Sequence, residues 1–178
     1  MGQSNQSVRA FLITEAFRFI DRVVTIPGLR RIALLGSIVT PKVDPKDVDI
    51  LITIDNDTDL TVLATAARRL KGLAQGMNKG ADIFLANPDG LYIGRICHWS
   101  RCGPQFRSTC DAWNCGVRHY LHDDFDDIRL SSHMVKEPPL VIWPMVIYRQ
   151  KIADDLRPFL VKYNGTMMEH ETTRLNKA

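Results

Sequence analysis

The segment 34–54, LLGSIVTPKVDPKDVDILITI, places two aspartates at the head of an otherwise apolar run. Asp47 and Asp49 open the stretch DVDILITI, whose apolar and β-branched content is typical of a buried strand. Aspartate is depleted from strand interiors, and a carboxylate is rarely buried without a partner. Either the two side chains face solvent at a strand edge, or they bind something of opposite charge.

The spacing of the two aspartates favours a metal site. Residues i and i+2 of a strand point to the same face, with Cα atoms roughly 6.5 Å apart. Two such carboxylates repel each other unless a cation compensates, and Mg²⁺ (or Mn²⁺) prefers carboxylate oxygens. Asp82, inside the apolar run ADIFLA, would add a third carboxylate from an adjacent strand. We therefore expect Asp47, Asp49 and Asp82 to be both metal ligands and catalytic residues for displacement at phosphorus.

Gly36-Ser37 ends the preceding apolar run and predicts a phosphate-binding turn. A glycine lets the backbone approach a phosphate closely, and the serine hydroxyl with nearby N–H groups can cradle an anion. In the following loop, Thr40 and Lys46 would add a donor and a charge for the nucleotide, or they are solvated loop residues.

This order of motifs resembles the DNA polymerase β-type nucleotidyltransferase superfamily, and its small minimal members match best in size. The resemblance covers roughly residues 30–86. It implies that Gly36 and Ser37 bind the nucleotide triphosphate and that Asp47, Asp49 and Asp82 hold the metals. The chain departs from the usual pattern in two places. The loop IVTPKVDP lacks the glycine or basic residue that usually follows soon after Gly-Ser. The acidic motif usually opens with a Ser-Asp pair, and here Lys46 precedes Asp47.

The resemblance implies an enzyme that moves a nucleoside monophosphate from a nucleoside triphosphate, such as ATP, to an acceptor hydroxyl. The acceptor, whether protein, RNA or small molecule, stays open. The alternative is a catalytically degenerate binding module of the same fold, antitoxin-like or contacting protein or RNA. A nucleic-acid-binding zinc protein is a third interpretation, which the modest net charge of +3 disfavours.

Hydrophobic periodicity predicts an α+β fold, an α/β sandwich in which a small mixed sheet packs against flanking helices. Helices are expected over 8–24, 60–74 and 145–156, and strands before Gly36, after Lys46 and over 81–86 and 91–96. We expect a nucleotidyltransferase-like core over 1–96, a cysteine-bearing segment with a closing helix packed on it over 97–163, and a flexible tail over 164–178.

The segment between the core and the closing helix holds all four cysteines of the chain. The intervals between them are four, seven and four residues, looser than the usual zinc-binding pairs. A zinc ion held by all four thiolates would order this aperiodic segment, and reduced free thiols are the alternative. The nearby histidines are interpreted as structural. The four thiols are Cys97, Cys102, Cys110 and Cys115.

Length and composition indicate an ordinary globular protein. The chain has 178 residues, 45% of them hydrophobic and 24% charged, enough for one domain with a sizeable core. Charges interrupt every apolar run short of the ~20 residues that span a membrane, and the N-terminus has no pattern of a signal peptide. We expect a cytoplasmic protein that does not bind membranes. A protein partner is compatible with this composition.

Overall fold

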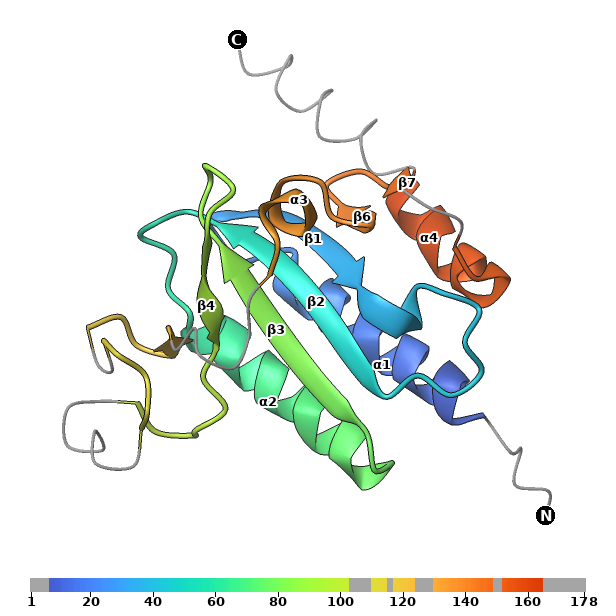
Figure 1. Cartoon of the computed structure of the whole chain (residues 1–178), viewed down its shortest axis with the longest axis horizontal. Coiled ribbons are helices and arrows are strands. Elements are labelled where there is room, and N and C mark those ends of the chain that lie inside the picture. Colours follow the sequence, from blue (N-terminus) through green and yellow to red (C-terminus); the bar gives the residue numbers. More distant parts are fainter. Residues whose placement is uncertain (1–6, 103–109, 115–116, 124–129, 149–151, 165–178) are drawn as a thin grey trace, which may run out of the picture.

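The computed structural model describes residues 7–102, 110–114, 117–123, 130–148 and 152–164. Within them, seven strands form one mixed sheet in the order β5-β4-β3-β2-β1-β6-β7, and four α-helices flank it, which confirms the α+β class (Figure 1). The elements in chain order are α1 (Val8–Val23), β1 (Leu29–Leu35), the 3₁₀-helix η1 (Gly36–Ile38), β2 (Asp47–Ile54), α2 (Thr61–Gly76), β3 (Gly80–Ala86), β4 (Tyr92–Ile96), β5 (Leu121–His122), α3 (Ser132–Lys136), β6 (Leu140–Trp143), β7 (Ile147–Tyr148), the 3₁₀-helix η3 (Asp154–Leu156) and α4 (Arg157–Asn164).

The centre of the sheet is the β2-α2-β3 unit. β2 and β3 are parallel and joined by α2, whereas all other neighbouring strands of the described sheet are antiparallel. A parallel pair needs such a crossover, because its second strand must start at the same end of the sheet as the first. The crossover therefore decides which residues of β3 lie beside the acidic head of β2.

The two faces of the sheet are covered differently. α1 and α2 lie behind the sheet and bury its larger apolar face, which includes Ile50 and Ile52 of β2 (Figure 1). The opposite face carries a smaller apolar cluster, in which Leu51 and Phe84 pack against Val135 of α3. Side chains alternate along a strand, so Asp47 and Asp49 belong to the face of Leu51. The acidic pair thus lies on the less covered face.

Both long helices begin as local sequence predicts. Ser7 caps α1, and its hydroxyl accepts a hydrogen bond from Ala10 N at 3.2 Å. Asp59 precedes α2, and its carboxylate accepts from both the backbone N and the Oγ1 of Thr61, at 2.9 and 2.7 Å. Such side chains satisfy N–H groups that the first helical turn leaves unpaired.

The closing helix predicted over 145–156 is wrong. In the structure, Ile147–Tyr148 pairs with β6 as strand β7, and the helix α4 begins only at Arg157. Pro158 is the second residue of α4. Proline fits there because the N–H groups of a first helical turn have no intrahelical acceptor to lose.

Strands from both predicted segments share one sheet. β5, β6 and β7 come from beyond residue 96 and belong to the same sheet as the strands of the 1–96 segment. The boundary at residue 96 stays a prediction. Residues 165–178, most of the predicted tail, lie outside the described residues. Among the helices that the structure describes, none combines the length and apolar character needed to cross a membrane.

Candidate metal and nucleotide site

The structure brings the three predicted aspartates together on one face of the sheet. Asp49 of β2 is in register with Asp82 of β3, and Asp47 is in register with Gly80. Residues paired in a parallel ladder project to the same face, with neighbouring strands about 4.8 Å apart. The crossover through α2 thus places Asp82 beside the pair Asp47 and Asp49.

Two glycines make room for these carboxylates. Gly36 has φ +65°, and a Cβ atom there would lie 2.7 Å from Asp49 Oδ2. A Cβ atom at Gly80 would overlap Asp47 Oδ1. We call Asp47, Asp49 and Asp82 together the acidic group. The Gly36 backbone lies directly beside this group, as the predicted phosphate turn requires. Gly80 was not predicted as a site residue, and its signal is its position opposite Asp47 in the parallel register.

The acidic group carries an excess of negative charge. The pKa of Asp49 is raised from 3.8 to about 6 by burial first, and then by the charges of Asp47 and Asp82. A cation lies at its edge, since Lys71 Nζ of α2 is 3.6 Å from Asp82 Oδ1 and both side chains are about a third exposed. Lys71 was not predicted from the sequence, because no local pattern distinguishes it from other lysines on a helix.

The turn after β1 has its own internal bonds. Thr40 Oγ1 donates to the carbonyl of Ser37 at 2.9 Å, so this hydroxyl closes the turn. Ser37 is half-buried, while the side chain of Lys46 is exposed at the other end of the loop. The carbonyl of Lys46 accepts from Gly80 N at 3.1 Å, which ties the loop end to the start of β3.

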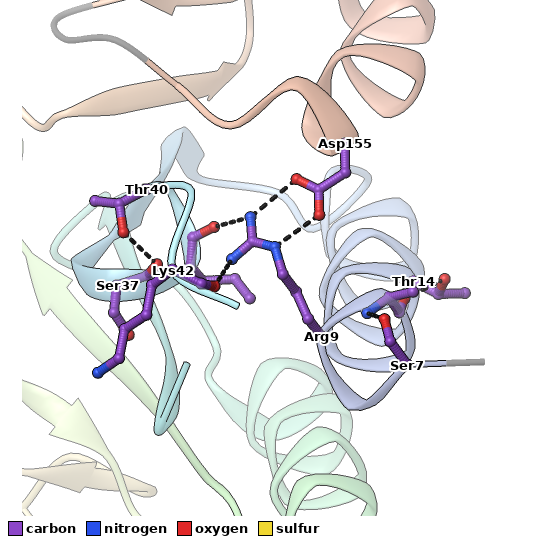
Figure 2. A network of polar contacts seen from close by, with 9 residues as sticks. Ser7, Arg9, Thr14, Ser37, Thr40, Lys42 and Asp155 are labelled. Carbon is purple, nitrogen blue, oxygen red and sulfur yellow. Dashed lines mark hydrogen bonds and ion pairs between the residues drawn. The ribbon is translucent and has the colours of Figure 1, made fainter. Parts of the chain in front are cut away.

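Arg9 anchors the same loop from outside (Figure 2). Its guanidinium donates to the carbonyl of Lys42 at 2.8 Å and to that of Ile38 at 3.1 Å. Nε and Nη2 also bind the two carboxylate oxygens of Asp155, at 2.6 and 2.9 Å. Arg9 therefore joins α1, the loop and η3 in one contact.

Sequence reasoning missed Arg9, although a signal exists. A cation in the first turn of a helix lies at the positive end of the helix dipole, where it is unfavourable without a partner. Arg9 occupies that turn, and its side chain is only 9% exposed. The sequence does not say which acid compensates it.

The donor set suits a hard divalent cation. Asp47, Asp49 and Asp82 offer only carboxylate oxygens, the ligands that Mg²⁺ and Mn²⁺ prefer. The predicted zinc set differs in chemistry, and part of it can be placed. Cys97, Cys102 and Cys110 are free thiols in the structure, and Cys115 lies outside the described residues.

The chain was compared with known proteins at three levels. No family model, no curated protein and no solved structure matches it.

Proposed function

We propose that this protein is a metal-dependent nucleotidyltransferase similar to the polymerase β-type superfamily, moving a nucleoside monophosphate from a nucleoside triphosphate to an acceptor hydroxyl. The observation that carries the proposal is the convergence of three carboxylates from two parallel strands beside the backbone of Gly36. The raised pKa of Asp49 supports it, because an uncompensated acidic group gains most from binding a cation.

The chain's own groups divide the work. Asp47, Asp49 and Asp82 hold one or two Mg²⁺ ions, which neutralise charge on the transferring phosphate when bound. Gly36 and Ser37 bind phosphate oxygens through the backbone and the hydroxyl.

Asp82 has a second role in this proposal. It is the candidate base that accepts the proton of the acceptor hydroxyl, because it is the member of the acidic group that comes from β3 and not from β2. Lys71 Nζ lies 3.6 Å from Asp82 Oδ1, at the edge of the same site.

Two residues of the loop complete the nucleotide site. Thr40 holds Ser37 in place through its carbonyl, and Lys46 adds a positive charge at the exposed end of the loop. The acceptor is a protein, an RNA or a small molecule, and the compartment in this proposal is the cytoplasm.

Ligand binding is the first test. The wild-type chain and Asp49→Asn are melted with each of the four common nucleoside triphosphates, with and without Mg²⁺. Asp89→Asn is the matched control, because Asp89 is exposed in the turn between β3 and β4. We expect Mg²⁺-dependent stabilisation by at least one nucleotide in the wild type and in Asp89→Asn, and none in Asp49→Asn.

Transfer is the second test. The best nucleotide, labelled on its α-phosphate, is incubated with the protein and with candidate RNA, protein and small-molecule acceptors. Incorporation of label that depends on Mg²⁺ and on Asp49 supports the enzyme. Binding without incorporation favours the degenerate binding module, and equal ligand stabilisation of wild type and Asp49→Asn contradicts the site itself.

A further inference from the structure

A second group of metal-binding side chains lies away from the acidic site, at the β5 edge of the sheet. One ring nitrogen of His122, Sγ of Cys110 and one carboxylate oxygen of Asp111 all lie within 4.8 Å of one another. His122 belongs to β5 and is paired with Arg95 of β4, whereas Cys110 and Asp111 precede β5 in the chain. The sheet therefore holds one member and a loop delivers the other two.

His122 has an unsatisfied nitrogen although it is buried. Its side chain is 1% exposed, and its Nε2 lies 2.7 Å from Asp111 Oδ1. Its Nδ1 is buried and has no hydrogen-bond partner among the described residues. The ring thus lacks a partner that its burial would ordinarily require. Apart from Asp111, no described residue hydrogen-bonds the ring, so its polar contacts end in this cluster.

The side chains of His122 and Asp111 point toward the same place. Nε2 of His122 and Oδ1 of Asp111 lie 2.7 Å apart, close enough for both atoms to ligate one ion in place of the hydrogen bond between them. The Asp111 side chain is 70% exposed, so an ion can reach this carboxylate from solvent. The cluster thus presents an imidazole, a carboxylate and a thiol that ionises on binding a metal.

Two further cysteines contact Tyr120, the residue that precedes β5. Cys102 Sγ accepts a hydrogen bond from Tyr120 N at 3.1 Å, and Cys97 N donates to Tyr120 O at 2.8 Å. Burial raises the pKa of Cys97, and the neighbouring Cys110 and Cys102 raise it further. Sulfur, nitrogen and oxygen donors together select a borderline-soft ion over Mg²⁺.

We propose that Cys110, Asp111 and His122 form a Zn²⁺ site, with a fourth position open to a neighbouring thiol or to water. This set shares Cys110 with the four-cysteine site expected from the sequence and adds Asp111 and His122, of which His122 was interpreted as structural. Zinc affinity then adds folding free energy at the residues that hold the ion. The inference does not rest on the proposed nucleotidyl transfer.

The test measures Zn²⁺ binding to the full chain under reducing conditions. Metal content is determined after purification, affinity by competition with a chelating dye, and thiolate ligation by the ultraviolet absorption of the Co²⁺-loaded protein. The variants are Cys110→Ser, Asp111→Asn and His122→Gln. His133→Gln is the matched control, because His133 is exposed on α3 and lies outside the cluster.

We expect one Zn²⁺ per wild-type chain, and affinity at least ~10-fold weaker in each cluster variant. Cys110→Ser should also lose sulfur-to-cobalt absorption, while His133→Gln behaves as wild type. Asp111 is 70% exposed, so Asp111→Asn still decides the question if His122→Gln fails to fold. A wild-type chain without zinc affinity, or unchanged affinity in Cys110→Ser and Asp111→Asn, overturns the site. Neither result affects Mg²⁺-nucleotide binding, which is measured separately on the same variants.

Discussion

At the scale of single residues, the geometry around Asp49 sets the chemistry. Its carboxylate is in register with Asp82, two residues from Asp47, and against the backbone of Gly36. Burial and two like charges raise its pKa to about 6. Without a cation the folded protein bears this repulsion, and with one the same arrangement becomes a ligand set.

Replacing Asp49 by asparagine should therefore separate stability from binding. In the absence of metal at pH 7.5, Asp49→Asn removes a repelled buried charge and melts above the wild type, by roughly 2–4 °C for each kcal/mol relieved. The same change deletes an anionic ligand, so stabilisation by Mg²⁺ and nucleotide is lost. Thermal melts with and without ligand measure both. A variant that melts lower and gains as much from ligand as wild type would show that Asp49 is structural.

The raised pKa of Asp49 predicts how stability depends on pH. The folded state keeps this proton up to about pH 6, whereas the unfolded chain releases it near pH 4. Between these values the folded state binds more protons, so the free energy of unfolding falls as pH rises through this window, by on the order of 3 kcal/mol, and then levels off. Urea unfolding of the metal-free protein from pH 4 to 7.5 measures it.

Asp49→Asn is the control for that titration, because subtracting its curve removes the contribution of all groups that do not interact with Asp49. The difference between the two proteins should be confined to pH 4–6. A difference that is flat across this window would contradict the raised pKa of Asp49.

Gly80 offers a test of the site that spares the fold. Alanine there would push the Asp47 carboxylate away, and because that oxygen is the end of a flexible side chain, the stability cost is small. We expect Gly80→Ala to melt near the wild type but to bind Mg²⁺-nucleotide at least ~10-fold more weakly, since the displaced group is an ion ligand. Gly76→Ala is the control, with open space around its Cβ. Isothermal titration should find equal affinity for the two variants if Asp47 is not a ligand.

At the scale of elements, Arg9 connects segments far apart in the sequence. It binds Asp155 of η3, 146 residues away, and two carbonyls of the loop after Gly36 (Figure 2). The backbone also contributes, since Ala153 N donates to Val39 O at 2.9 Å. The end of the described chain thus holds the loop that is expected to bind phosphate.

Arg9→Lys should loosen this loop. Lysine keeps the charge, but its single ammonium group cannot bind Asp155 and both carbonyls at once as the planar guanidinium does. We expect a loss of about 1–3 kcal/mol in the free energy of unfolding, and faster amide exchange at Val39 and Thr40. Arg22→Lys is the control, because Arg22 is exposed in the last turn of α1. Unchanged exchange in Arg9→Lys would show that the loop does not depend on this anchor.

At the scale of the whole molecule, the sheet separates two groups of side chains that could bind metals. α1 and α2 cover one face, where the larger core cluster lies, which leaves the other face to carry the acidic group and the smaller α3 cluster. The β5 edge holds the thiols, of which Cys97, Cys102 and Cys110 are unpaired in the structure. A charged site and a thiol site thus share one scaffold.

The cysteines should be reduced or metal-bound in the cell. Thiols persist in a reducing compartment, and a metal ion protects them further. Mass spectrometry of protein alkylated at the moment of lysis should find Cys97, Cys102 and Cys110 without disulfides, modified directly or only after chelation. Disulfides among them in fresh lysate would contradict both the compartment and the zinc site.

Local patterns were enough to predict much of the fold. α1, β2 and α2 follow from hydrophobic periodicity and capping residues, which act within a few positions along the chain. The closing helix failed because the apolar run at 140–148 suits a strand as well as a helix, and the choice depended on pairing with β1 and β6. Periodicity within one segment does not show whether a neighbouring strand is present to pair with it.

The candidate site divides in the same way. By itself the sequence determined that Asp47 and Asp49 share a face and that Gly36-Ser37 ends a strand, because strand alternation and glycine geometry are local. Only the tertiary structure decided that Asp82 lies beside Asp49, through the register of a parallel pair that depends on how α2 packs.

The remaining partners also come from separate segments of the chain. Lys71 near Asp82, Asp155 on Arg9, and His122 beside Cys110 and Asp111 all meet through contacts between separate elements. No propensity encodes such contacts, because the free energy that selects them comes from burying the whole sheet and its helices, and it places side chains that have no local relation to one another.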